Sequence, residues 1–413
     1  MKYSEALDWL YSQKKLQKRE DLSRIKRAIE LLGIHTDYQI IHIAGTNGKG
    51  SVASYLNQMC MDFGKKVGMF VSPYVVSFNE RIEVNQIYIP EEKVIEYIEK
   101  LKIFSKDYWQ KYHDIIPFFE LTFLMALLYF EEQNIEVLIL ECGLGGRLDA
   151  TNVLKKNAAV ITNIGYEHVK ELGPTLEEIA WHKLGITRSN IPCLTSVDEA
   201  ILPIFQTYAE EHHFPLIYTK NDVESIQVKE TFTEFTYKKR VYQTSLRGVF
   251  QAYNAALAIE TIFRLYPNYP ENLLKNALIK TSWPGRFERV KSNIILDGAH
   301  NLPGIQALVE TIHCAYPEHK IKVVFTALRD KDIHQMLSIL DQVAEQYYFT
   351  SILDARASRI EDIAQSTKRP YQCYDNYLDA IAAATKELSV NELLVITGSL
   401  HFISEVRRLF KKE

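Results

Sequence analysis

The sequence predicts an α/β protein with a mostly parallel sheet, built as a larger domain followed by a smaller one. Apolar runs of strand length alternate with helical patterns over most of the chain. Glycine-rich loops follow several of these strands, as in doubly wound folds. The length of 413 residues is that of two or three domains.

The composition is ordinary for a globular protein, with 47% apolar and 24% charged residues. The net charge of −4 gives no reason to expect nucleic acid or an anionic membrane surface as a partner. The apolar stretch 117–130 is too short to span a bilayer and contains Glu120, so we expect a buried helix. Residues 1–10 lack the apolar core of a signal peptide. The cysteines form no C-x-x-C pair, so we expect reduced core thiols and a cytoplasmic protein: Cys60, Cys142, Cys193, Cys314 and Cys373.

The most informative stretch is a predicted strand, 39–44, followed by Gly-Thr-Asn-Gly-Lys-Gly-Ser and a helical pattern from Ser51. Glycines let a backbone approach phosphate oxygens closely, and the first N–H groups of a helix have no partner within it. Lys49 would neutralise the outer phosphates, and the Ser51 hydroxyl would bind magnesium. The spacing differs from the usual G-x-x-x-x-G-K-[ST] pattern, because Gly50 separates the lysine from the serine.

The remaining elements of the first domain follow in order. We expect helices over residues 1–37, 91–102, 118–133 and 175–184, and strands at 65–71, 137–141 and 158–164. Residues 72–82 are either a surface crossover or, because they directly follow a parallel strand, a site loop.

Several polar side chains stand where these strands end. Glu141 closes an apolar strand, where phosphate-loop enzymes place an acid that holds magnesium. The glycine-rich loop 142–152 follows this strand and carries Arg147 and Asp149, whose charged side chains can bind a ligand. His168 follows the next strand and is interpreted as a ligand or contact rather than a structural histidine.

Further along, residues 226–246 alternate as in a small antiparallel hairpin, and helices are expected at 246–263 and 273–279. A linker at 283–288 leads to a second α/β unit, so we place the domains at 1–287 and 288–413. Its strands are expected near 293–297, 321–327, 346–351 and 392–397, with polar loops at their ends.

Seven ordered motifs make the chain similar to a known family: GTNGKGS, SPYVVSFNERI, LECGLGGRLDATN, IGYEH with HKLGI, WPGRFE, LDGAHN and TGSLHFISEVR. From about residue 20 to the C-terminus the sequence resembles folylpolyglutamate synthase and its relative dihydrofolate synthase, of the Mur ligase superfamily. The resemblance implies a P-loop ATPase domain and a smaller Rossmann-like C-terminal domain. It also implies that ATP, with Mg²⁺, phosphorylates the γ-carboxylate of a reduced folate, or the carboxylate of dihydropteroate, before L-glutamate displaces phosphate. We expect a monomer.

The resemblance also assigns roles by position. It implies that the ATP contacts are Asn47, Gly48, Lys49, Gly50, Ser51, Asn254, Arg286 and Asp297. It implies that the magnesium ligands are Ser51, Ser72, Glu141, His168 and Lys183, the last as a carbamate formed with carbon dioxide. Substrate contacts are expected at Phe119, Arg147, Asp149, His300 and Ser399, and the catalytic set is Lys49, Lys183 and His300. For Lys183, the alternative is a helix-end lysine that only offsets the helix dipole.

The chain departs from the family pattern near the pterin and metal regions, at Tyr74, Pro117-Phe118, Glu167 and Trp181-His182. These changes leave open whether the chain makes dihydrofolate, extends polyglutamate, or does both. Two other functions remain. A Mur-type ligase for a cell-wall precursor usually carries another N-terminal domain, for which the residues before Gln39 are too few. A non-catalytic nucleotide-binding regulator is disfavoured by the joint presence of Lys49, Glu141, His168 and Lys183.

Overall fold

The computed structural model describes residues 1–14, 21–354, 356–386 and 388–410. Packing divides the chain into two compact units, residues 1–221 with 254–277, and residues 222–253 with 278–413. The sequence instead predicted a domain boundary between residues 287 and 288, which would assign residues 222–253 to the first domain. That boundary stays a prediction, because compactness alone does not define a functional domain.

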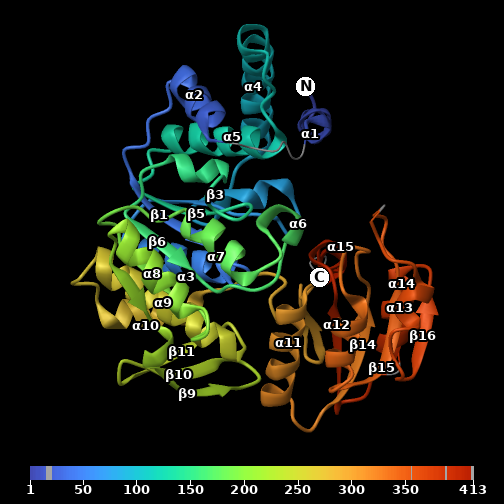
Figure 1. The fold of residues 1–413 in the computed structure, drawn as a ribbon. Coiled ribbons are helices and arrows are strands. Elements are labelled where there is room, and N and C mark those ends of the chain that lie inside the picture. The colour runs from blue at the N-terminus through green and yellow to red at the C-terminus, as the bar shows by residue number, and fades with distance from the viewer. Residues whose placement is uncertain (15–20, 355, 387, 411–413) are drawn as a thin grey trace. The chain divides into compact units, whose positions relative to one another are not determined.

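The first unit is built on an eight-stranded sheet with the order β4-β3-β2-β5-β1-β6-β7-β8 (Figure 1). Strands β2, β5, β1, β6, β7 and β8 are parallel, while β3 and β4 form an antiparallel edge. The strands are β1 (Gln39–Ala44), β2 (Val67–Phe70), β3 (Ile82–Val84), β4 (Ile87–Tyr88), β5 (Val137–Glu141), β6 (Ala158–Ile161), β7 (Cys193–Thr195) and β8 (Leu216–Tyr218). The mostly parallel sheet was predicted, but the short antiparallel edge was not.

Helices cover both faces of this sheet, and Figure 1 shows α3 and α5 on opposite sides of β1 and β5. The predicted helix 118–133 is α5, and its residues 120–130 are all buried, as its nearly uniform apolar sequence requires. None of the helices in the described ranges is long and apolar enough to cross a membrane. The helices are α1 (Tyr3–Ser12), α2 (Ser23–Leu32), α3 (Lys49–Asp62), α4 (Glu91–Tyr112), α5 (Phe118–Glu132), α6 (Val169–Leu172), α7 (Leu176–Leu184), α8 (Leu202–His212), α9 (Val249–Leu265) and α10 (Glu271–Lys280).

Several expected boundaries were wrong. The helix predicted over 1–37 is two helices, α1 and α2, and residues 15–20 between them lie outside the described residues. The helix predicted to end at 102 continues to Tyr112, and the loop 72–82 contains a 3-10 helix, η1 (Phe78–Arg81). Two further 3-10 helices are η2 (Ala150–Val153) and η3 (Lys220–Asp222). Two thiols expected in the core, Cys314 and Cys373, are exposed.

The second unit contains a three-stranded antiparallel sheet and a six-stranded sheet with the order β12-β13-β17-β14-β15-β16. The predicted hairpin is therefore three strands: β9 (Val223–Val228), β10 (Thr233–Tyr237) and β11 (Arg240–Thr244). In the larger sheet only β12 pairs in the antiparallel sense. Its strands are β12 (Glu288–Lys291), β13 (Ile294–Leu296), β14 (Lys320–Phe325), β15 (Ala344–Thr350), β16 (Tyr371–Tyr374) and β17 (Glu392–Thr397). Strands β12 and β16 were not predicted.

Helices pack on both faces of the six-stranded sheet because alternate residues of its strands are apolar on each face. Ile295, Val323 and Val395 belong to the apolar core that includes residues of α11, α12 and α13. Their neighbours along the strands belong to the core with α14 and α15. The helices are α11 (Leu302–Ala315), α12 (Ile333–Leu340), α13 (Ile360–Ala364), α14 (Tyr377–Lys386) and α15 (Leu400–Phe410).

A buried ion pair joins α2 to α5 inside the first unit. Arg24 donates from Nε and Nη2 to the two oxygens of Glu120, at 2.8 and 2.9 Å, and the Glu120 side chain is 1% exposed. Glu120→Gln removes the more buried of two carboxylates that pair with Arg24, and the half-buried Asp114, 3.2 Å from Nη1, remains. We therefore expect this variant to lower the free energy of unfolding by about 2 kcal/mol.

Urea unfolding of this variant measures the loss. The matched control is Glu96→Gln, which removes an exposed partner of Lys93 and should cost less than about 0.5 kcal/mol. Equal losses in the two variants would contradict the importance of the buried pair.

Candidate active site

The loop predicted to bind phosphate, residues 45–48, lies between β1 and α3 and is called the phosphate loop below. The helix after it begins at Lys49 and not at Ser51. Gly48 is the N-cap with a φ of 85°, and as a glycine it has no side chain to cap the helix. The first N–H groups of an α-helix have no carbonyl partner within it, which makes a helix start of this kind suited to an anion. A side chain at Gly48 would lie 2.6 Å from Oδ1 of Asn254, so Asn254 is in contact with the loop.

The loop is fastened to the residues that follow β6. The backbone N–H of Asn47 donates to Oδ1 of Asn163 at 2.9 Å, and that of Thr46 donates to the Asn163 carbonyl at 3.0 Å. The Thr162 hydroxyl donates to the Asn47 carbonyl at 2.5 Å. Sequence reasoning missed Thr162 and Asn163, although their place at a strand end beside the loop was a usable signal.

Lys49 is positioned by the loop itself. Its ammonium donates to the carbonyl oxygens of Gly45 at 2.8 Å and Thr46 at 3.0 Å. The cation thus lies over the loop, where phosphate oxygens would also lie if the loop binds nucleotide. Ser51, in the first turn of α3, is buried.

Of the predicted magnesium ligands, Glu141 and Ser72 lie together. Glu141, at the end of β5, is 4% exposed and accepts a hydrogen bond from the Ser72 backbone N–H at 3.3 Å. His168 is an exposed N-cap residue of α6 with a φ of 46°. No group of three or more His, Cys, Asp or Glu side chains suited to a metal occurs among the residues that the structure describes. The predicted magnesium ligands would not form such a group, because only Glu141 and His168 among the five are of these residue types. The carboxylate and hydroxyl oxygens of the predicted ligands suit Mg²⁺.

Lys183 is buried although it lies in the last turn of α7. Its side chain is 1% exposed, and its ammonium donates to Oε1 of Glu167 at 2.5 Å. Burial lowers the pKa of Lys183, while Glu167 opposes this shift by favouring the ammonium. A solvated helix-end lysine that only offsets the helix dipole does not fit this burial. The role of Glu167 was not predicted, because nothing in the sequence shows which carboxylate reaches α7.

The glycine-rich loop after β5 is held by Asp149. This buried carboxylate accepts from the backbone N–H groups of Gly143, Leu144 and Thr151 at 2.9–3.1 Å, and from the Thr151 hydroxyl. In this structure the Asp149 side chain therefore stabilises the conformation of the loop to which it belongs. Phe119 lies against the loop, since a side chain at Gly143 would be 2.5 Å from its ring.

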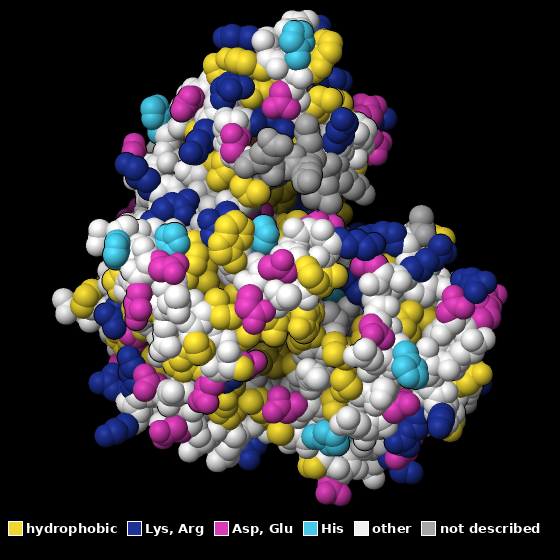
Figure 2. All heavy atoms as spheres, viewed as in Figure 1, with side chains coloured by type: hydrophobic (Ala, Val, Ile, Leu, Met, Phe, Trp, Pro, Cys, Tyr) yellow, Lys and Arg dark blue, Asp and Glu magenta, His cyan; other side chains and the backbone are white. Residues whose placement is uncertain are grey.

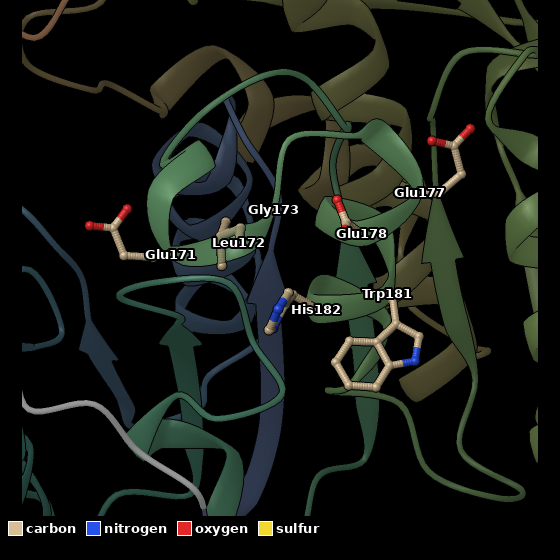
Figure 3. A pocket seen from close by; sticks show the side chains of 7 residues that line it. All are labelled: Glu171, Leu172, Gly173, Glu177, Glu178, Trp181 and His182. Atoms are coloured by element: carbon tan, nitrogen blue, oxygen red, sulfur yellow. The ribbon is translucent and has the colours of Figure 1, made fainter.

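Arg147 extends from this loop toward α7 and α8. Its guanidinium carbon lies 3.5 Å from the ring centroid of Trp181, and Nη2 donates to the Tyr208 hydroxyl at 2.7 Å. Trp181 and His182 border a hollow of about 460 Å³ that Glu171, Glu177 and Glu178 also line, together with Leu172 and Gly173 (Figure 3). The predicted roles of Arg147 and Asp149 as substrate contacts stay predictions.

In the second unit, the predicted residues gather where β13 and β17 end. The buried Asp297 accepts from the backbone N–H groups of Phe287 and Ala299, both at 2.8 Å. Burial raises the pKa of Asp297, and Arg286 opposes this shift. A side chain at Gly298 would lie 2.7 Å from the Arg286 guanidinium, so Arg286 packs on the same loop.

His300 and Ser399 stand on the two loops of this edge. Nδ1 of the half-buried His300 lies 2.8 Å from the Gly298 carbonyl oxygen. Because a carbonyl only accepts, Nδ1 carries the proton and Nε2 of a neutral ring presents a lone pair. Ser399 is buried after Gly398, whose φ of 110° and closeness to the Thr326 carbonyl exclude a side chain.

Comparison with known proteins agrees with this geometry. Residues 118–262 match the Mur ligase middle domain, and residues 285–400 match the Mur ligase glutamate ligase domain. The dihydrofolate synthase/folylpolyglutamate synthase of Bacillus subtilis strain 168 is 35% identical over 99% of both chains. The chain belongs to the folylpolyglutamate synthase/dihydrofolate synthase family. It is therefore an ATP-dependent ligase with a Mur-ligase-like α/β fold, as the sequence predicted.

Two further relatives agree over nearly the whole length. The folylpolyglutamate synthase of Lacticaseibacillus casei is 28% identical over 99% of this chain and 98% of its own. The structure of Mycobacterium tuberculosis folylpolyglutamate synthase complexed with ADP has a TM-score of 0.91 at 26% identity, covering 100% of this chain and 98% of that one. The E. coli FolC structure in complex with DHPP and ADP has a TM-score of 0.88 at 26% identity, with 100% and 98% covered.

The contact between Gly48 and Asn254 gives a first test of the phosphate loop. We expect Gly48→Ala to weaken ATP binding by at least about tenfold, because the new methyl group would push the loop away from Asn254 and strain its positive φ. Equilibrium titration with ATP measures this loss.

Gly33→Ala is the matched control, since Gly33 also has a positive φ, of 67°, but nothing lies within 4 Å of its added side chain. We expect it to cost about 1 kcal/mol of stability and to leave ATP binding unchanged. Wild-type ATP affinity in Gly48→Ala would show that this loop does not carry the nucleotide.

Proposed function

We propose that the chain joins L-glutamate to the γ-carboxylate of reduced folates through an acyl-phosphate intermediate. The observation that supports this most is the ammonium of Lys49, which lies on the loop that precedes α3 and donates to the carbonyl oxygens of Gly45 and Thr46. A carboxylate is a poor acylating agent because an oxide would have to leave. Phosphate leaves far more easily, so one ATP activates the acid and the amine of glutamate then displaces phosphate.

The residues of the first unit supply charge to this phosphoryl transfer. Asn47, Gly48, Gly50 and Ser51 would contact the phosphates at the start of α3, and Lys49 would neutralise the charge that develops on them. We propose that Ser51, Ser72, Glu141, His168 and Lys183 would hold magnesium, with Lys183 doing so as a carbamate, because an unmodified ammonium has no lone pair to offer a metal. When bound, the metal would withdraw charge from the phosphate oxygens. Asn254, Arg286 and Asp297 are proposed to contact ATP.

In the second unit, His300 and Ser399 are proposed to hold the incoming glutamate. Nε2 of His300 can accept a proton when its ring is neutral, which suits a group that faces an attacking amine. Phe119 is proposed to contact the acid substrate from the first unit.

Dihydropteroate is the second acid we consider, and it would make the chain bifunctional. The relatives with names for both activities support either substrate. The two other functions, a cell-wall ligase and a non-catalytic regulator, are not favoured, since relatives matching at nearly full length carry folate ligase names.

We also propose that the reaction takes place in the cytoplasm and that the chain is a monomer. All five cysteines are free thiols, which fits a reducing compartment. On the face shown in Figure 2, Lys and Arg side chains are interspersed with Asp and Glu, which fits small-molecule substrates rather than a polyanion.

Lys49→Ala tests the central step. We expect glutamate-dependent ADP release to fall by at least about 100-fold, because the transferring phosphoryl group loses a preorganised cation. The assay follows ADP with L-glutamate and tetrahydrofolate, and in parallel with L-glutamate and dihydropteroate, which separates the two activities.

Lys65→Ala is the control, since this lysine forms only an exposed pair with Glu136. Normal turnover in Lys49→Ala would remove the proposed role of the loop. ATP binding without any glutamate-dependent ADP release from the wild type, with either acid, would favour the non-catalytic regulator.

Substitution of Lys183 tests the proposal that this side chain is carbamylated. We expect Lys183→Ala to reduce turnover by at least about 100-fold, with partial recovery in added acetate, because a small anion can enter the space that the side chain leaves. Lys170→Ala, at an exposed position of α6, is the control. A crystal structure with magnesium that shows an unmodified Lys183 still paired to Glu167 would contradict the carbamate.

A further inference from the structure

Arg81 is a buried cation that the proposed mechanism does not use. It ends η1, directly before β3, and it is 8% exposed. Its guanidinium carbon lies 5.1 Å from the ring centroid of Tyr74 and 5.7 Å from that of Phe118. Its Nε is buried and has no hydrogen-bond partner within the described part of the chain.

Both rings lie within cation–π distance of the guanidinium, whose N–H donors lie along its edge. Among the described residues, no carboxylate forms an ion pair with Arg81, although Glu141 is near enough to favour its charged form. Arg24 is a contrasting case in the same unit, because Nε and Nη2 donate to the two oxygens of Glu120 and Nη1 donates to Asp114. A buried guanidinium without such a partner is costly unless a ligand supplies one.

The aromatic side chains around Arg81 form a frame that comes from three separate segments. The rings of Tyr11, in α1, and Phe118, in α5, stack at 5.7 Å with an angle of 23°. The hydroxyl groups of Tyr11 and Tyr74 are 3.0 Å apart. Tyr74 and Phe118 are half-buried, so part of this frame is exposed to solvent. Both are also positions at which the sequence departs from the pattern of the family.

We propose that Arg81 binds the carboxylate of the acid substrate through the edge of its guanidinium, while Tyr74 and Phe118 hold its plane. This inference rests on the proposed function and adds a substrate-binding residue to it. A guanidinium and a carboxylate match as planar groups with two parallel hydrogen bonds. Glu141, which favours the charged form of Arg81, is also one of the residues assigned to magnesium, so a carboxylate bound to Arg81 would lie on the side of the site where it must meet the phosphate.

The test is a comparison of two ligands on the full-length protein without ATP. Tetrahydrofolate and its γ-carboxamide analogue are titrated into the wild type, Arg81→Met and Arg81→Lys, and dissociation constants are measured by calorimetry. We expect the wild type to prefer the acid by about 30-fold or more, and Arg81→Met to prefer it by less than about threefold. Arg81→Lys should lie between them, because lysine keeps the charge and loses the planar fork.

Arg27→Met is the matched control, since Arg27 also lies over an aromatic ring, 4.5 Å from the ring centroid of Tyr112, but is only half-buried. It should keep the wild-type preference. An unchanged preference in Arg81→Met would overturn the inference, and if that variant does not fold, an unchanged preference in Arg81→Lys does the same. Failure of the wild type to bind tetrahydrofolate would instead count against the proposed function.

Discussion

The shape of the phosphate loop depends on hydrogen bonds from the residues that follow β6. Thr162 and Asn163 fix the backbone of Thr46 and Asn47, and Gly45 is required because a side chain there would overlap the Thr162 hydroxyl. A loop held in this way presents the first N–H groups of α3 in one orientation before any ligand arrives. Lys49 and Ser51 take their positions from the same backbone, so the parallel pairing of β1 with β6 is a condition for the whole site.

The larger features could be predicted because their signals are local. Strands β1 and β5 are continuous apolar runs. The sequence predicted the residue at which each of them ends. The helix over residues 175–184 was located by a capping box in which Thr175 and Glu178 bond each other, and the structure contains it. The loops at strand ends were located because parallel strands end at a common edge.

What the sequence could not show depends on contacts between distant segments or on very short elements. Strands β3, β4 and β12 have two to four residues each, too few for a period to be recognised. The start of α3 was placed two residues late because glycine disfavours helix, whereas Gly48 is suited to the left-handed N-cap. The pairing of Lys183 with Glu167 and the approach of Arg81 to the rings of Tyr74 and Phe118 arise only in the folded chain.

The distribution of thiols has a practical consequence. Cys60, Cys142 and Cys193 are buried and belong to the first compact unit, whereas Cys314 and Cys373 are exposed and belong to the second. A maleimide dye added to the native enzyme will therefore attach to one unit alone, without any engineered cysteine. The second unit of the natural sequence can therefore be labelled selectively, while the thiols of the first unit stay protected by the fold.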